Sequence, residues 1–161
     1  MSLSNDIFRA WARPAEVMRA QLAKGRREDR ALMLLMAACL LIFVAQLPRL
    51  AREAHLTGQD LQMLMGGTLL AWIFVAPLLL YVIALLARGI ARLLGGRGTA
   101  YGARLALFWA LLASTPLILL HGLVGGFIGP GPAKTAVGLI WTAVFLWFWI
   151  GGMLASERRP A

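Results

Sequence analysis

The chain has 161 residues, of which 60% are hydrophobic, and its mean hydropathy is +0.75. A water-soluble fold of this length could not cover so many apolar side chains, so the composition excludes an ordinary soluble domain and predicts an all-α membrane protein. The net charge of +9 is also compatible with nucleic-acid binding. We do not expect that function, because the basic residues cluster beside the apolar runs, where they would contact the anionic headgroups of a lipid bilayer.

Residues 1–30 form a basic segment, with seven Arg or Lys residues against four acidic ones. Ile7, Phe8 and Trp11 predict the apolar edge of a short first helix. The spacing of apolar residues then predicts a second helix over 15–24, with a proline that suits its first turn and a glycine that suits its end. We expect this cytoplasmic segment to be amphipathic and to lie in the headgroup layer, with a loosely ordered tail as the alternative.

Four apolar runs occupy the transmembrane domain expected over residues 31–156. A helix needs about 20 apolar residues to cross a bilayer, and each run is close to that length or longer. A short polar tail follows over residues 157–161. We therefore predict a polytopic bundle of four transmembrane helices, whose apolar runs cover residues 31–47, 61–94, 104–126 and 134–155.

Three prolines should interrupt these helices, since proline has no backbone N–H and its ring crowds the preceding turn. We expect Pro48 to end the first span. Pro77 and Pro116 lie within the second and third runs and should kink them, which leaves backbone carbonyls without their usual partners. The hydroxyls of Ser114 and Thr115 are suited to bond such carbonyls.

Basic residues are distributed unequally between the two ends of the predicted spans. Thirteen Arg or Lys residues lie in the N-terminal segment, in the link between the second and third spans and in the C-terminal tail, against three in the two opposite links. Basic loops stay on the cytoplasmic side of a membrane. Both termini should therefore be cytoplasmic, in a multi-pass protein of the cell inner membrane.

The apolar runs contain no Asp, Glu or Lys beyond their ends, which argues against proton-coupled transport, acidic ion channels and intramembrane metalloproteases. Cys39 is the only cysteine, so a disulfide within the chain is excluded.

His121 is the exception to the lack of acid–base groups within the apolar runs. We expect it to be a structural histidine bonded to Thr142 or to a freed carbonyl; a metal or haem ligand, with His55 approaching from the first outer link, is the alternative. We predict no catalytic residue, metal site or cofactor.

Two small-residue spacings, Gly122-x-x-x-Gly126 and Gly151-x-x-x-Ala155, allow helices to approach closely and predict packing at those positions. The fourth run is unusually aromatic. Trp141 and Trp149 fit the aromatic belts of membrane interfaces, with a lipid or cofactor platform as the alternative.

The link between the second and third runs has a recognisable order of motifs. An apolar helix ends in Gly95-Gly96-x-Gly98-Thr99, and Ala113-Ser114-Thr115-Pro116-Leu117 follows about fifteen residues further on. This order resembles the centre of the YIP1 family of small multi-pass membrane proteins, specifically its short bacterial members, over roughly residues 30–155. The resemblance implies a helical bundle and a membrane-scaffold role, and it assigns no functional residue. Family members are usually described with five spans, whereas we predict four.

These observations favour a non-enzymatic integral membrane protein that organises lipid or binds a partner, either another membrane protein or a second copy of itself. Its expected working surfaces are a set of cytoplasmic arginines and the kinked helices at Pro77 and Pro116. A small transporter or channel for a neutral or lipid-like solute is the alternative function. The arginines that we expect to contact lipid or a partner are Arg9, Arg13, Arg19, Arg26, Arg27, Arg88, Arg92 and Arg97.

Overall fold

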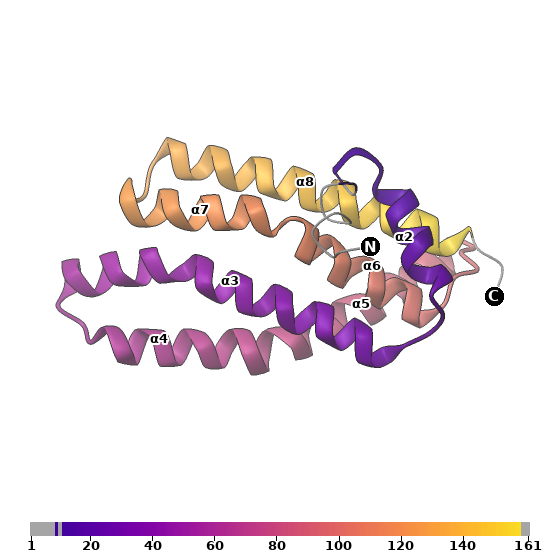
Figure 1. The fold of residues 1–161 in the computed structure, drawn as a ribbon, viewed down its shortest axis with the longest axis horizontal. Coiled ribbons are helices and arrows are strands. Elements are labelled where there is room, and N and C mark those ends of the chain that lie inside the picture. The colour runs from indigo at the N-terminus through magenta and orange to yellow at the C-terminus, as the bar shows by residue number, and fades with distance from the viewer. Residues whose placement is uncertain (1–8, 10, 159–161) are drawn as a thin grey trace.

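In a computed structural model, which describes residue 9 and residues 11–158, the chain is an elongated bundle of helices without a strand among those residues (Figure 1). Three helices are long and apolar enough to cross a membrane, and the bent pair α6–α7 makes a fourth if it counts as one span. The prediction of an all-helical protein with helices of membrane-spanning length is confirmed. The helices are α2 (Pro14–Ala23), α3 (Glu28–Thr57), α4 (Leu61–Leu70), the π-helical η1 (Ala71–Val75), α5 (Ala76–Leu93), α6 (Ala100–Ala113), α7 (Thr115–Phe127) and α8 (Pro132–Glu157).

The short helix α2 lies close to the range expected over 15–24. Pro14 occupies its first turn, where the missing N–H costs no hydrogen bond. Gly25 follows the helix with a φ of +87°, a backbone conformation that side chains disfavour. The first helix expected at Ile7 and Phe8 lies outside the described residues.

The first span does not end at Pro48, and that prediction is wrong. α3 continues through this proline to Thr57. Pro48 packs on Gly126 of α7, where the space is open only because glycine has no side chain: a Cβ there would lie 2.7 Å from the Pro48 carbonyl carbon. Packing between the two helices thus offsets the hydrogen bond that Pro48 cannot donate. The helix ends instead at Gly58, which has a left-handed φ of +70°.

The second pass accommodates Pro77 by widening its turn. The helix runs without interruption over Leu61–Leu93, but residues 71–75 form a π-helical turn just before the proline. Within this turn the Ala76 N–H donates to the Ala71 carbonyl, five residues back, rather than four. In a regular α-helix the Pro77 ring would crowd the backbone of the preceding turn. The wider π-helical turn leaves room for the ring, so the irregular hydrogen bonds are confined to this turn.

The third pass bends by 46° between α6 and α7, two residues before Pro116. In a regular helix an N–H at Pro116 would bond to the Leu112 carbonyl. Thr115 Oγ1 donates to that carbonyl at 2.7 Å, and Ser114 Oγ donates to the Leu111 carbonyl at 3.0 Å. The two hydroxyls therefore satisfy carbonyls at the break, as the sequence predicts.

The core of the bundle is built around α6. Twelve of the fourteen residues of this helix are buried, in contact with α2, α3, α5 and α8. Leu105, Phe108 and Leu112 of α6 belong to the same apolar cluster as Leu35 and Ile42 of α3. By contrast, α4, α5 and α8 carry many exposed leucines, isoleucines and aromatic residues, as lipid-facing helices do.

Glycines set the closest helix contacts. A Cβ on Gly122 of α7 would lie 2.7 Å from the carbonyl carbon of Ala45 of α3, so the two backbones touch. Gly152 of α8 similarly faces Ala106 of α6, with 3.2 Å from its would-be Cβ to the Ala106 Cβ. The Gly122-x-x-x-Gly126 spacing therefore serves packing within one chain.

Candidate functional site

The predicted arginines gather at one end of the bundle. Those that precede α3 lie on α2 or beside it, and the others lie at the end of α5 or in the loop that follows. Figure 1 shows α2, the end of α5, the start of α6 and the end of α8 together at the right of the view. We call this end, which carries Arg13, Arg19, Arg92 and Arg97, the basic end.

α2 is fixed to the basic end by its apolar face. Val17, Met18 and Gln21 are buried against the bundle, and Met18 has no exposed surface at all. Trp11, just before α2, packs edge-on against Phe148 of α8, with 5.7 Å between the ring centroids. Because these contacts hold one face of α2, its other face presents charged side chains outward.

Most of the exposed arginines that flank α2 have an acidic neighbour. Arg13 lies 3.2 Å from Glu16, and Arg27 lies 2.8 Å from Asp29, a hydrogen bond that raises the pKa of Arg27. Such exposed pairs contribute little to stability, so the cations remain available to a stronger anion. Arg19, Arg92 and Arg97 are exposed and have no ion pair within the part of the chain that the structure describes. Arg26 lies 3.6 Å from Glu28.

Arg88 has a different environment from the other predicted arginines. It is only 17% exposed and donates to both oxygens of Glu157, at 3.2 and 3.3 Å. Glu157 also accepts the Gly98 backbone N–H at 2.7 Å, and a Cβ on Gly96 or Gly98 would collide with this carboxylate. The glycine-rich loop therefore folds around Glu157 and ties the ends of α5, α6 and α8 together. Arg88 is therefore part of this network, and its contact with lipid or a partner stays a prediction.

A second ion pair links the start of α3 to α6. Arg104 donates to Glu28, and its guanidinium carbon lies 6.0 Å from the centroid of the Tyr81 ring of α5. The pair joins residues 76 positions apart in the sequence. Together with the Glu157 contacts, it gives the basic end two sets of polar contacts between helices.

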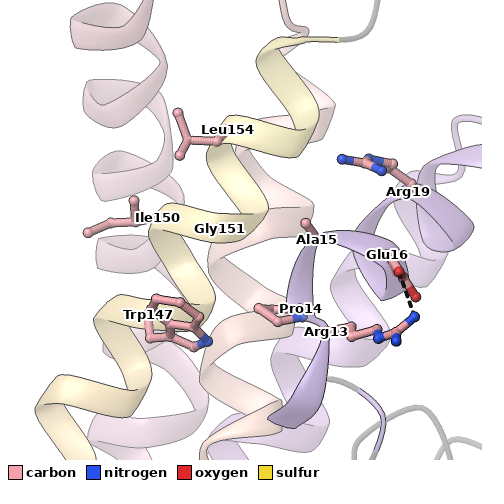
Figure 2. Close-up of a pocket in the computed structure, with 9 residues that line it drawn as sticks. All are labelled: Arg13, Pro14, Ala15, Glu16, Arg19, Trp147, Ile150, Gly151 and Leu154. Carbon is pink, nitrogen blue, oxygen red and sulfur yellow. Dashed lines mark hydrogen bonds and ion pairs between the residues drawn. The ribbon is translucent and has the colours of Figure 1, made fainter.

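A groove runs between α2 and α8 at this end. Its volume is about 630 Å³, within the range of ligand sites in proteins. Trp147, Ile150 and Leu154 form its apolar wall along one face of α8, Arg19 lines it from α2, and Arg13, which precedes α2, is bonded to Glu16 (Figure 2). At the floor, Pro14 lies against Gly151, whose would-be Cβ is 3.5 Å from the Pro14 Cγ. The full lining is Arg13, Pro14, Ala15, Glu16, Arg19, Trp147, Ile150, Gly151 and Leu154.

At the opposite end, Arg52 of α3 closes the end of α7. Its Nη1 donates to the Gly126 carbonyl at 3.2 Å and to the Phe127 carbonyl at 3.5 Å. A cation at the C-terminus of a helix is favourable, because the last carbonyls are unpaired and carry partial negative charge. The sequence counts Arg52 only as a link residue, and its partners are more than 70 positions away.

His121 does not bond to Thr142, so that prediction is wrong. The Thr142 hydroxyl donates instead to the Gly138 carbonyl one turn earlier, at 2.9 Å. The His121 ring lies against Gly138 of α8, whose would-be Cβ lies 3.4 Å from Nε2. Within the described residues, no group of three His, Cys, Asp or Glu side chains could hold a metal ion.

The aromatic residues of α8 divide into two sets. Trp141, Phe145 and Trp149 form a ladder with 5.7 Å between successive ring centroids, and they pack against the core. The Trp141 indole N–H donates to Ser114 Oγ at the bend of the third pass, at 3.2 Å. Trp147, on the other face, is 64% exposed and lines the groove.

No protein-family model, curated protein or solved structure matches this chain. The resemblance to the YIP1 family stays a prediction, and the function must be inferred from the basic end itself.

The basic end is suited to binding anions and apolar groups together. It combines exposed guanidinium groups with the apolar groove wall on α8, which is the pairing that a membrane surface or an acidic, amphipathic partner offers. The polar contacts described above join side chains to one another or to helix ends, and none of them aligns a nucleophile with a base.

Proposed function

We propose that this chain is a non-enzymatic integral membrane scaffold with four spans, whose basic end binds the acidic inner surface of the membrane and a partner protein. The uncharged stretches 31–48 and 135–156 would extend about 27 and 33 Å as helices, which matches the hydrocarbon thickness of about 30 Å. Since basic residues stay inside, the basic end and both termini lie at the cytoplasmic face of an inner membrane.

The observation that carries the proposal is the docking of α2. The buried Met18 and Gln21 fix this helix across α6 and α8, so its arginines are presented on a rigid support at the level where α8 reaches its polar end. A tail that only awaited a membrane would need no such contacts. A rigid, basic surface is what a scaffold requires to hold lipid headgroups and a partner in a fixed geometry.

A transporter of a neutral or lipid-like solute is the second candidate, favoured by the 46° bend of the third pass. The packing of α6 argues against it, because nearly every side chain of this helix is buried in the core at the basic half of the bundle. In liposomes, a transporter should raise solute flux above that of a Pro77→Leu control. A scaffold should leave the flux at the level of protein-free vesicles.

Site-specific photo-cross-linking in intact membranes tests the scaffold directly. A benzophenone amino acid at position 97, in the exposed loop of the basic end, should capture a discrete partner protein. The matched control is position 63 of α4, which is 79% exposed at the opposite end of the bundle. If both positions gave the same adducts, or neither gave any, the basic end would have no specific partner and the proposal would be wrong.

A further inference from the structure

The groove between α2 and α8 has a charge arrangement that selects its occupant. Arg13 and Glu16 form an ion pair on one side, so their charges largely cancel (Figure 2). Arg19 also lines the groove, and it has no ion pair among the described residues. The groove therefore carries a net positive charge on α2, opposite an apolar wall on α8.

The apolar wall is a continuous helical stripe. Trp147, Ile150 and Leu154 are spaced so that they share one face of α8, and all three are more than half exposed. Seven residues separate Trp147 from Leu154, so the stripe extends for about 10 Å along the helix axis. It ends one turn before Glu157, where the polar contacts of the basic end begin. The groove thus crosses from apolar to polar surroundings.

We propose that this groove binds one acidic phospholipid of the inner leaflet. Its phosphate lies beside Arg19, and the start of an acyl chain packs on Ile150 and Trp147. An acidic lipid is favoured over a zwitterionic one, because the choline or ethanolamine cation would meet the guanidinium groups without a matching carboxylate other than Glu16, which Arg13 already holds. The inference rests on the proposed membrane orientation, and it assigns a specific ligand to one part of the basic end.

Native mass spectrometry of the purified protein tests the site, with phosphatidylglycerol as the acidic probe and phosphatidylcholine as the zwitterionic one. The unaltered protein should retain one phosphatidylglycerol molecule in preference to phosphatidylcholine. Arg19→Gln should lower the retained fraction about fivefold, as expected for the loss of one basic residue at a membrane surface. Lys24→Gln is the matched control, since it removes the same charge from an exposed position just after α2 and outside the groove.

A variant of opposite sign makes the test sharper. Glu16→Gln removes the one negative charge among the residues that line the groove, so retention of phosphatidylglycerol should rise. On the apolar wall, Ile150→Ser should lower retention, whereas Ile140→Ser, an equally exposed site nearer the other end of α8, should not.

Several results would overturn the inference. These are equal retention of the two lipids, equal effects of Arg19→Gln and Lys24→Gln, or a protein dimer that Ile150→Ser dissociates, since a second copy would then occupy the groove. Displacement of the lipid by soluble glycerol phosphate alone would show that the acyl chain has no role, and would also refute it. The cross-linking at position 97 does not depend on the groove. A captured partner without a retained lipid would therefore refute this inference and still support the proposed scaffold function.

Discussion

Adding one methyl group at Gly122 should separate two helices of the bundle. In Gly122→Ala the new Cβ would lie 2.7 Å from the Ala45 carbonyl carbon, whereas carbon atoms prefer separations of about 3.5–4.0 Å. The atoms nearest to the new Cβ are backbone atoms of Ala45, so the clash cannot be relieved by the rotation of a side chain. α3 and α7 would have to move apart by at least about 1 Å, because the Ala45 carbonyl oxygen lies even nearer to the new Cβ than the carbonyl carbon.

The cost can be estimated from packing alone, since helices in lipid associate without a hydrophobic driving force between them. A gap of about 0.5–1 Å forfeits roughly a quarter to a half of each dispersion contact along the interface. Overpacked cores typically lose about 1–3 kcal/mol. We expect the upper end of that range, about 3 kcal/mol, because the contact is centred on this interface and the same motion also loosens Pro48 from Gly126.

Gly66→Ala is the matched control. Gly66 is also a helical glycine in a membrane span, but no described atom lies within 4 Å of its would-be Cβ. There, alanine should be neutral or stabilise the protein by up to about 1 kcal/mol through its better helix propensity. Unfolding by SDS in mixed micelles, followed by far-UV circular dichroism, measures both variants. If Gly122→Ala unfolded at the same SDS fraction as Gly66→Ala, the backbone contact inferred between α3 and α7 would be refuted.

Three further predictions concern the polar contacts at the two ends and the orientation of the chain in the membrane. Glu157→Ala should lower the free energy of unfolding by about 2 kcal/mol, between the values for exposed and buried ion pairs, because Arg88 and a loop N–H lose their acceptor; an equal loss in a variant of an unpaired arginine would refute this. Arg52→Gln should cost about 1 kcal/mol in the same assay by uncapping α7. Single cysteines at Gln59 and Arg97, in a background without the buried natural cysteine, should react with an impermeant maleimide from opposite sides of the membrane; labelling of both from one side would disprove the four-span orientation.

Hydropathy predicted the helices but could not predict which of their faces are buried. Phe108 and Phe74 both lie in apolar runs of similar composition, yet Phe108 is completely buried in α6 and Phe74 is 68% exposed. In a soluble protein, polar residues would mark the outer face of each helix. In a membrane protein both lipid and core are apolar, so that signal is weak and the central position of α6 does not follow from the sequence.

The candidate site was predicted in part. The charge asymmetry placed most of the arginines at one end, and Pro14 and Gly25 indicated the limits of α2. The sequence did not predict that Glu157 would hold Arg88, because these residues are 69 positions apart and a lone acid in a basic tail has no periodic pattern. The groove also escaped prediction, since it depends on the docking of α2 against α8.

The three prolines show what the sequence around a residue can and cannot predict about a helix. Each lacks the same N–H, and each predicts an irregular helix at a known position. The structure nevertheless treats them differently: Pro48 stays inside α3, Pro77 follows a π-helical turn, and Pro116 lies at a 46° break. The outcome at Pro48 depends on Gly126, which leaves space for the ring. The outcome at Pro116 depends on the adjacent hydroxyls of Ser114 and Thr115, which donate to carbonyls of the preceding turn. A proline therefore fixes where the hydrogen-bond pattern must change, while the surrounding side chains determine whether the helix continues, widens or bends.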